Sequence, residues 1–367
     1  MLIGIDGSRT AKDNHTGTEL YSTKLIQMFM QIDSKNQYIL YTPKDLTPRI
    51  GNLANNFTQN IIPFKKLWTQ IRLSWEMLKD KNKLDVLFIP SHTIPFIHPK
   101  KTVVTIHDLG FLHFPQLYSS SELAYQKMGL SLAIKYASHI ITPSIFTKKD
   151  IVQNFGLNPK KISVVYHGYD NDLYKPRIYP KKDEGMPYIF SVGRLEHKKN
   201  IVGLLKAYEM LRREPKIKHK LVLAGKPGFG YDEYQKILKS LSQEIQNDVI
   251  ELGYITDQEK ASWIKNADVF FFPSLFEGFG LPIIEAMACG IPVVASNTTS
   301  IPEVAGDCGL LINPNKPFEM AAAMSKIIND PKLYKTLSNK GKNRASQFSW
   351  EKSANQTLEI LENIAKE

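Results

Sequence analysis

The chain of 367 residues contains only two cysteines, Cys289 and Cys308. Two cysteines provide neither a disulfide framework nor the ligand spacing of a cysteine-based metal site, so we expect a reducing, cytoplasmic setting. Long hydrophobic runs are also missing, because none reaches the roughly 18–20 residues that cross a bilayer. Residues 1–6 lack a basic region followed by a long apolar core, so this segment is not predicted to be a secretory signal.

A dinucleotide fingerprint is missing as well, since no Gly-x-Gly-x-x-Gly follows a predicted strand. This absence disfavours a nicotinamide-dependent oxidoreductase. Negative charge is in short supply: the chain has 47 Lys and Arg against 36 Asp and Glu, a net charge of +11. Residues 1–175 account for +8 and the remainder for +3. The basic half fits an anionic membrane surface or a phosphorylated acceptor, and no nucleic acid is expected because no nucleic-acid motif is visible.

Apolar strands alternate with helical stretches along the whole chain, which predicts parallel sheets with crossover helices. We expect strands at 2–6, 38–41, 86–89, 103–106, 139–142, 162–165, 188–192, 220–224, 249–252, 269–272, 292–295 and 309–312. We expect helices at 18–31, 68–80, 121–136, 145–155, 200–213, 231–246, 257–265, 282–289, 317–329, 331–346 and 350–365.

The segment 174–187 has three prolines and no periodicity, which is typical of a linker. The sequence therefore predicts two Rossmann-like α/β domains, at 1–175 and 176–349, with the last helix able to pack back on the first. Ligands of such sheets bind beyond the carboxyl ends of the strands.

The segment from Glu277 to Glu285 is the most informative for function. An apolar strand precedes it, Gly278 and Gly280 predict a tight turn, and Pro282 suits the first turn of a helix. Free N–H groups at that helix start, together with the helix dipole, favour an anion. The two carboxylates can accept hydrogen bonds from hydroxyls, so the segment fits a nucleotide sugar. A structural pair of glutamates is the plainer alternative.

A second strand-to-helix loop carries Arg194 and Lys199, with Asn200 as the expected N-cap of the next helix. Two cations at such a junction suit a diphosphate, whose growing charge they could stabilise as it leaves. A solvated basic loop would have the same composition.

Four further strand-end loops offer candidate contacts. His107 and Asp108 could meet a sugar hydroxyl or handle a proton, or His107 could merely cap its strand. Gly17 and Thr18, at a predicted helix start, could approach phosphate or sugar. The loops at 225–230 and 253–256 could line a base or ribose pocket, or could be simple turns.

Residues 64–75 mix the cations Lys65, Lys66 and Arg72 with the aromatics Trp68 and Trp75. This mixture suits a membrane interface or a lipid-linked acceptor. An ordinary packed helix with a solvated basic face explains it equally well, and we favour that alternative.

Three stretches together, 193–200, 273–296 and 300–307, resemble the family 4 retaining glycosyltransferases of GT-B fold. The C-terminal half matches over nearly its whole length, and the N-terminal half more loosely. The likeness is greatest to mannosyltransferase-type members that build surface polysaccharides.

The resemblance implies transfer of a hexose, mannose first, from a GDP- or UDP-linked sugar to a glycan or lipid-linked acceptor. It implies retention of configuration and no metal or other cofactor. It makes His107, Arg194, Lys199 and Glu277 the catalytic group. It assigns substrate binding to Gly17, Thr18, Asp108, Gly225, Tyr254, Ile255, Gly278, Phe279, Gly280, Leu281 and Glu285. A nucleotide-sugar 2-epimerase of the same fold and a non-catalytic glycan- or nucleotide-binding subunit stay open as alternatives.

Overall fold

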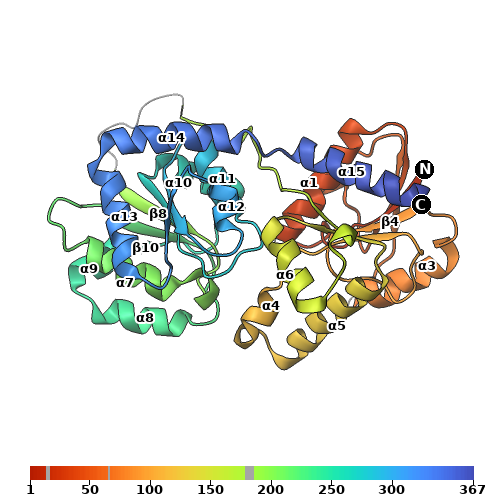
Figure 1. The fold of residues 1–367 in the computed structure, drawn as a ribbon, viewed down its shortest axis with the longest axis horizontal. Coiled ribbons are helices and arrows are strands. Elements are labelled where there is room, and N and C mark those ends of the chain that lie inside the picture. The colour runs from red at the N-terminus through yellow and green to blue at the C-terminus, as the bar shows by residue number, and fades with distance from the viewer. Residues whose placement is uncertain (14–16, 65–66, 178–185) are drawn as a thin grey trace. The chain divides into compact units, whose positions relative to one another are not determined.

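The structure is a computed structural model that describes residues 1–13, 17–64, 67–177 and 186–367. Contacts divide the chain into two compact units (Figure 1), each described here by itself. Unit 1 comprises residues 1–168 and 350–367, and unit 2 comprises residues 169–349. Lys65, Lys66 and part of the predicted linker, residues 178–185, lie outside the described residues.

Unit 1 is built on a seven-stranded parallel sheet in the order β3-β2-β1-β4-β5-β6-β7. Its inner strands are short and almost wholly buried, as expected when helices cover both faces of a parallel sheet. The strands are β1 Leu2–Asp6, β2 Gln37–Thr42, β3 Phe57–Ile61, β4 Val86–Ile89, β5 Thr102–Thr105, β6 His139–Thr142 and β7 Ile162–Val164.

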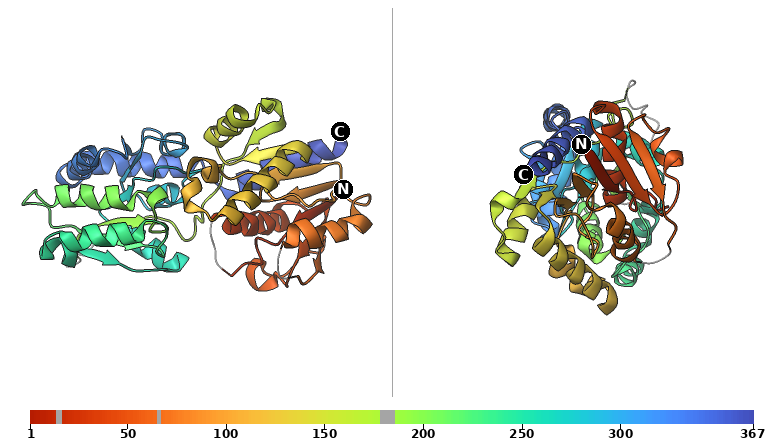
Figure 2. Two further views of the ribbon diagram at one scale, coloured as in Figure 1. Left: turned by 90° about the horizontal axis from the view of Figure 1, so that it is seen from below. Right: turned by 90° about the vertical axis from the view of Figure 1, so that its right-hand side faces the viewer.

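The helices of unit 1 cover its sheet on both sides (Figures 1 and 2). They are α1 Gly17–Ile32, α2 Thr47–Ile50, the π-helix η1 Trp68–Leu73, α3 Ser74–Asp80, α4 Gly110–His113, the 3₁₀ turns η2 Pro115–Leu117 and η3 Pro159–Lys161, α5 Ser120–Tyr136, α6 Ile145–Phe155 and α15 Trp350–Lys366. One hydrophobic cluster joins η1, α3 and α5 to the same face of the sheet through Leu73, Met77, Leu130 and Ala133.

Unit 2 has a six-stranded sheet in the order β10-β9-β8-β11-β12-β13, again with every pair parallel. The strands are β8 Tyr188–Val192, β9 Lys220–Ala224, β10 Val249–Glu251, β11 Val269–Phe272, β12 Val293–Ser296 and β13 Leu310–Ile312. The helices are the 3₁₀ turn η4 His197–Lys199, α7 Ile201–Leu211, α8 Tyr231–Ser240, α9 Gln243–Asp248, α10 Asp257–Asn266, α11 Leu281–Ala288, α12 Ile301–Ala305, α13 Pro317–Asn329 and α14 Pro331–Ala345.

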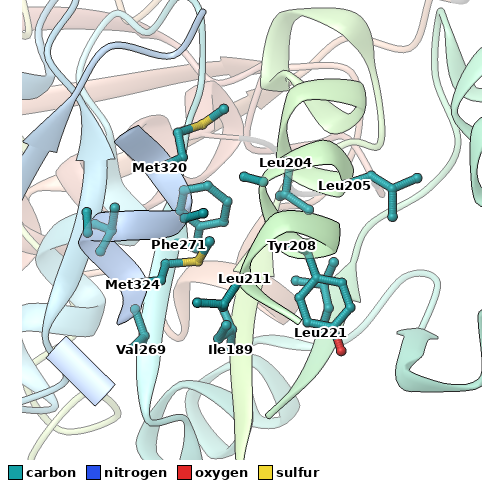
Figure 3. Packing of buried hydrophobic residues seen from close by; sticks show 14 of the residues in the cluster. Ile189, Leu204, Leu205, Tyr208, Leu211, Leu221, Val269, Phe271, Met320 and Met324 are labelled. Carbon is teal, nitrogen blue, oxygen red and sulfur yellow. The ribbon is translucent and has the colours of Figure 1, made fainter. Parts of the chain in front are cut away.

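The core of unit 2 lies between its sheet and helices α7 and α13 (Figure 3). Tyr208 and Leu211 from α7 meet Met324 from α13 over Ile189 and Phe271 of the strands, and all five side chains are buried. Burial of such side chains is worth roughly 1.5–3 kcal/mol each. This packing holds β8 and β11 side by side and so fixes the loops that follow them.

Several elements differ from the sequence predictions, among them the short helices α2 and α4, which were not expected, and the helix expected at 68–80, which is the π-helix η1 followed by α3. The edge strand β3 was not expected, because its sequence Phe-Thr-Gln-Asn-Ile is polar and only Phe57 is buried. The single helix expected at 231–246 is two helices, since Ser242 caps a new start at residue 243 by accepting a hydrogen bond from the Ile245 N–H. The short helix α12 was missed as well.

Unit 1 ends at Gly168, so the boundary predicted at residue 175 falls inside unit 2. Tyr174 is the physical reason, because its ring is 3% exposed and lies 5.3 Å from the Lys260 ammonium of α10. At the other end of the chain, α15 belongs to unit 1, where Trp350 lies 6.2 Å from Tyr21 of α1.

Candidate functional site

The order of strands reverses between β8 and β11, and these two strands pair with each other. At such a reversal the chain leaves the carboxyl ends of neighbouring strands in opposite directions, which opens a place for a ligand. The loop after β8 carries Arg194 and Lys199, and the loop after β11 carries Glu277. A hollow at this place is lined by Gly193, Lys199 and the residues 272–274, among others. The structure therefore brings together residues that lie about 80 positions apart.

The turn into α11 has the geometry that its glycines and proline predict. Gly280 adopts φ +107°, a left-handed conformation that favours glycine, and Pro282 lies in the first turn of the helix. No side chain caps this helix start in the described part of the chain. Phe279 is buried, and its ring lies against Phe348 with a centroid distance of 5.9 Å. Gly278 and Leu281 flank this turn.

Lys199 and Glu277 form an ion pair, with the lysine Nζ 2.5 Å from a carboxylate oxygen of the glutamate. Both side chains are mostly buried, at 22% and 12% exposure. The lysine stem passes close to Gly193, where an added Cβ would lie 3.5 Å from it, and its ammonium lies 5.6 Å from the Phe272 ring. A cation and a hydroxyl acceptor are thus held together at the end of two adjacent strands.

Two residues that sequence reasoning missed hold the Glu277 loop in place. The Thr299 hydroxyl accepts a hydrogen bond from the Glu277 N–H at 3.2 Å. The Ser300 hydroxyl donates to the carbonyls of Glu277 and Phe279 at 2.9 and 3.0 Å. Short polar residues just after a buried strand were the available signal, but nothing in the sequence shows which loop they contact.

Arg194 has a looser setting than Lys199. Its side chain is 66% exposed, and its guanidinium lies 3.8 Å from the Glu196 carboxylate. Asn200 also differs from the expectation: it precedes α7 in a left-handed conformation, but its side chain forms no cap there and donates instead to the Pro314 carbonyl at 2.7 Å.

Glu285 is 3% exposed, and one carboxylate oxygen accepts a hydrogen bond from the Lys260 ammonium at 2.9 Å. Lys260 also pairs with Asp257 at 3.2 Å. Burial lowers the pKa of Lys260, but the two carboxylates outweigh it and raise that pKa above its usual value. The second oxygen of Glu285, Oε2, is buried without a hydrogen bond of good geometry. Tyr174 lies nearby, and burial together with the Glu285 carboxylate raises its pKa.

The loops predicted to meet a base lie side by side, because the Gly225 N–H donates to the Gly253 carbonyl at 2.7 Å. Gly225 also leaves no room for a side chain, since an added Cβ would lie 1.9 Å from the Gly193 carbonyl oxygen. Tyr254 is 57% exposed with the Lys226 ammonium 5.0 Å from its ring, and Ile255 is half-buried beside it.

His107 and Asp108 belong to unit 1, after β5. A ring nitrogen of His107 lies 3.0 Å from the Pro90 carbonyl, and the ring meets Tyr21 edge-on at 4.9 Å. Burial lowers the pKa of His107, which keeps the imidazole neutral at pH 7. Asp108 accepts a hydrogen bond from the Gly110 N–H at 2.7 Å and so supports the start of α4. Any contact of these two residues with substrate stays a prediction.

Gly17 and Thr18 begin α1, as the sequence predicts, and a Cβ at Gly17 would meet nothing within 4 Å. The next residue, Glu19, is buried and pairs with Arg9 and Lys12 at 3.4 and 3.6 Å. This pair of cations at the end of β1 was not predicted.

Metal ligands do not gather in the described part of the chain, where no group of three His, Cys, Asp or Glu side chains is placed to hold an ion. The sequence does contain one Asp-x-Asp, Asp170-Asn171-Asp172, which the expectation of no metal did not take into account. Asp170 there accepts a hydrogen bond from the Leu173 N–H at 3.1 Å. Independence from metal stays a prediction.

Comparisons with known proteins agree for both units. The family model described as "Glycosyl transferases group 1" matches residues 177–344, and "Glycosyltransferase Family 4" matches residues 37–173. The chain is 32% identical over 269 residues to O-antigen chain mannosyltransferase B of Escherichia coli, covering 71% of this chain and 69% of the relative. It is 31% identical to the MMP alpha-(1->4)-mannosyltransferase of Mycolicibacterium hassiacum, over 61% of this chain and 53% of that protein.

Solved structures share the fold at low sequence identity. Sucrose-phosphate synthase from Thermosynechococcus elongatus has a TM-score of 0.75 at 20% identity, over 99% of this chain and 98% of that one. HepE of Anabaena in complex with UDP-glucose has a TM-score of 0.74 at 20% identity, over 99% of both chains. Together with the two parallel sheets, these findings establish the GT-B fold. The chain belongs to the family 4, or group 1, glycosyltransferases.

Proposed function

We propose that the protein transfers mannose from a GDP- or UDP-linked sugar to a glycan or lipid-linked hydroxyl in the synthesis of surface polysaccharide. One observation carries this proposal: Lys199 and Glu277 pair at 2.5 Å beside the uncapped start of α11. A diphosphate suits the lysine and the helix start, and sugar hydroxyls suit the carboxylate. The names of the relatives support mannose, and the UDP-glucose complex of HepE supports a nucleotide sugar.

The ion pair suggests how the donor binds. In the structure the Glu277 carboxylate pairs with the Lys199 ammonium, which is the cation that the diphosphate needs. Donor binding therefore replaces the carboxylate with the diphosphate as the partner of Lys199. Lys199 then faces the phosphate, and Glu277 turns to the hydroxyls of the sugar. As the sugar leaves, charge grows on the diphosphate, where Lys199 and Arg194 stabilise it without a metal.

Glu285 is placed to bind the ribose. Lys260 satisfies one of its oxygens, and the Tyr174 hydroxyl lies beside the carboxylate, so a ribose hydroxyl would compete with Tyr174 for the other oxygen.

The proposed transfer retains the anomeric configuration, with the leaving phosphate taking the proton of the acceptor hydroxyl on the same face of the sugar. Glu277 positions the sugar in this scheme and forms no covalent bond. Isolation of a glycosyl ester on Glu277 from stopped reactions would contradict it, as would a product of inverted configuration by NMR.

The first experiment is a thermal-shift panel of GDP, UDP, ADP and dTDP with their common sugars, without metal. A ligand at 100 times its Kd stabilises the fold by about 2.7 kcal/mol, which is readily measured. We expect one nucleotide family to stabilise the protein, Glu285→Gln to abolish that shift, and Glu209→Gln on the surface of α7 to keep it.

A second assay separates transfer from the alternatives. The responding donor is incubated with and without acceptor, and products are identified by NMR. Transfer only with acceptor supports the proposal, whereas a new nucleotide sugar formed without acceptor identifies an epimerase. No response to any nucleotide in the thermal-shift panel would favour a non-catalytic glycan-binding subunit or a transferase that uses a lipid-phosphate donor.

We also propose that the protein works at the inner face of the cell membrane as a peripheral protein, since a lipid-linked acceptor lies there. Within the described residues no helix is long and apolar enough to cross a bilayer.

A further inference from the structure

Exposed apolar side chains gather on one side of unit 1. Ile71, Trp75 and Leu78 are 37%, 65% and 51% exposed and follow each other at spacings of four and three residues through η1 and α3. This spacing puts them on one face of the helix. The opposite face, with Leu73 and Met77, is fully buried against the sheet. The segment is therefore apolar on both faces, although only the inner one is needed for the core.

Neighbouring elements continue this surface. The Gln70 side chain donates to the Tyr125 hydroxyl at 2.7 Å, which ties η1 to α5. The Ile97 N–H donates to the Ser74 hydroxyl at 3.3 Å, which brings the loop before β5 beside α3.

These neighbours also expose large apolar side chains. Phe96 on the loop is 56% exposed, and Met128 and Tyr136 on α5 are 42% and 45% exposed. We call the six residues Ile71, Trp75, Leu78, Phe96, Met128 and Tyr136 the apolar face; α3 and α5 lie on the same side of the unit 1 sheet (Figure 1).

Positive charge surrounds the apolar face. Residues 67–101 and 120–136 contain eight Lys and Arg against four Asp and Glu. Lys79, Lys127 and Lys135 are exposed. Of the four acidic residues, Glu76 pairs with Arg72 at 3.1 Å and Asp80 with Lys83 at 2.9 Å, whereas Asp85 and Glu122 are exposed. A patch of exposed apolar side chains is uncommon on a soluble surface unless it contacts something.

We propose that the apolar face docks on an anionic lipid bilayer, with the Trp75 ring entering the interface and the three lysines meeting lipid phosphates. Charge selects this partner over a second copy of the chain, because two basic surfaces repel each other. An amphipathic tryptophan among lysines is the composition of helices that lie in a membrane interface. The alternative that we favoured from the sequence, an ordinary packed helix, accounts for the buried face with Leu73 and Met77 but not for the exposed apolar side chains.

This inference rests on the proposed function for its biological purpose, since a lipid-linked acceptor would be presented at such a surface. The observations that carry it concern unit 1 alone and are independent of the donor site.

The test is co-sedimentation of the whole protein with vesicles of phosphatidylcholine containing 30% phosphatidylglycerol, at low and high salt. We expect binding to the anionic vesicles that weakens at high salt. The double variant Ile71→Ser, Trp75→Ser should reduce partitioning by at least about 10-fold, because two apolar side chains no longer leave water. The matched control is Phe318→Ser in unit 2, which removes a side chain that is 75% exposed and should leave binding unchanged.

Tryptophan fluorescence gives a second readout that does not depend on a disruptive variant. Of the four tryptophans, only Trp75 is exposed. Brominated lipids should quench its emission, and Trp75→Phe should remove the quenching while the protein still sediments with vesicles.

Three results would overturn the proposal: no sedimentation of the wild type at low salt, equal loss in Phe318→Ser, or absence of quenching. A dimer in analytical ultracentrifugation that the double variant converts to monomer would do so too, by showing that a second copy covers the face. The nucleotide thermal shift, measured on the same samples, shows separately whether the donor site is intact.

Discussion

Units 1 and 2 have the same architecture, a parallel sheet with one reversal of strand order, but they treat buried titratable groups differently. Unit 2 keeps charges in pairs at the ends of its strands, Lys199 with Glu277 and Lys260 with Glu285. Unit 1 also pairs one buried carboxylate at a strand end, Glu19 with Arg9 and Lys12, but it adds three histidines in its strand-end loops. Burial lowers the pKa of His92, to about 4, and those of His107 and His167. The two units therefore differ in the histidines that unit 1 has at its strand ends more than in the presence of buried ion pairs.

The outer surfaces differ as well. Of the large hydrophobic side chains that are exposed in the described residues, unit 1 has eleven and unit 2 has three, Phe229, Tyr254 and Phe318. Because the two units have the same architecture, the architecture does not explain why unit 1 exposes more large hydrophobic side chains. It points to different partners: a nucleotide for unit 2 and an apolar, anionic surface for unit 1.

The largest effect is expected when a buried pair of unit 2 is broken. Lys260→Met removes the cation from Glu285 and leaves a buried carboxylate alone, which should lower the free energy of unfolding by about 3–5 kcal/mol. Urea denaturation measures this loss. The double variant Lys260→Met, Glu285→Gln should recover part of it, and no recovery would mean that Lys260 acts through packing alone.

The ion pair of Lys260 and Glu285 also predicts how stability depends on pH. Because the pKa of Lys260 is raised in the folded state, its contribution to stability is complete below the unfolded value of about 10.5 and is lost as pH rises through the folded value. Wild type should therefore lose stability more steeply than Lys260→Met above about pH 10.5. Parallel curves for the two proteins would argue against an ion pair.

The second largest effect is expected on the rate of sugar transfer. Lys199→Ala should lower kcat by on the order of 10²-fold, because the charge that develops on the diphosphate loses its partner. Steady-state kinetics with the donor found in the thermal-shift panel test this. Lys206→Ala on the exposed side of α7 is the control. An unchanged kcat in Lys199→Ala would remove this lysine from the mechanism and leave it as a structural partner of Glu277.

Unit 1 should lose stability in mild acid through His92. The unfolded chain protonates His92 near pH 6.5, whereas the folded protein resists protonation until about pH 4, with desolvation as the main cause and the Arg9 charge second. The unfolded state therefore binds more protons below pH 6.5, and stability falls as pH falls toward 4, by on the order of 1–3 kcal/mol. Unfolding curves at pH 7.0, 5.5 and 4.5 measure this, and His92→Gln should flatten the dependence. An equally steep loss in that variant would assign the effect to another group.

The sequence predicted the glutamate loop of unit 2 well because its signals are local. A buried strand, two glycines and a proline within 14 residues predict a strand, a tight turn and a helix start. The structure has these three features in that order. Lys260, Thr299 and Ser300 were missed because each reaches its partner across 20 residues or more, which only the fold decides. The polar edge strand β3 was missed for a related reason, since pairing with β2 rather than its own pattern makes it a strand.

The smallest change in the free energy of unfolding is expected for the exposed aromatic residues Trp75 and Phe318. Trp75→Ser and Phe318→Ser each remove an exposed ring, so each should change the free energy of unfolding by less than about 0.5 kcal/mol. Trp68→Ser, seven residues from Trp75, should cost about 3–5 kcal/mol, because that ring is 8% exposed and its N–H donates to the Ile62 carbonyl at 2.8 Å. Urea denaturation of the three variants measures these differences. A large loss in Trp75→Ser would show that its ring supports the fold, and its exposure would then no longer argue for a partner.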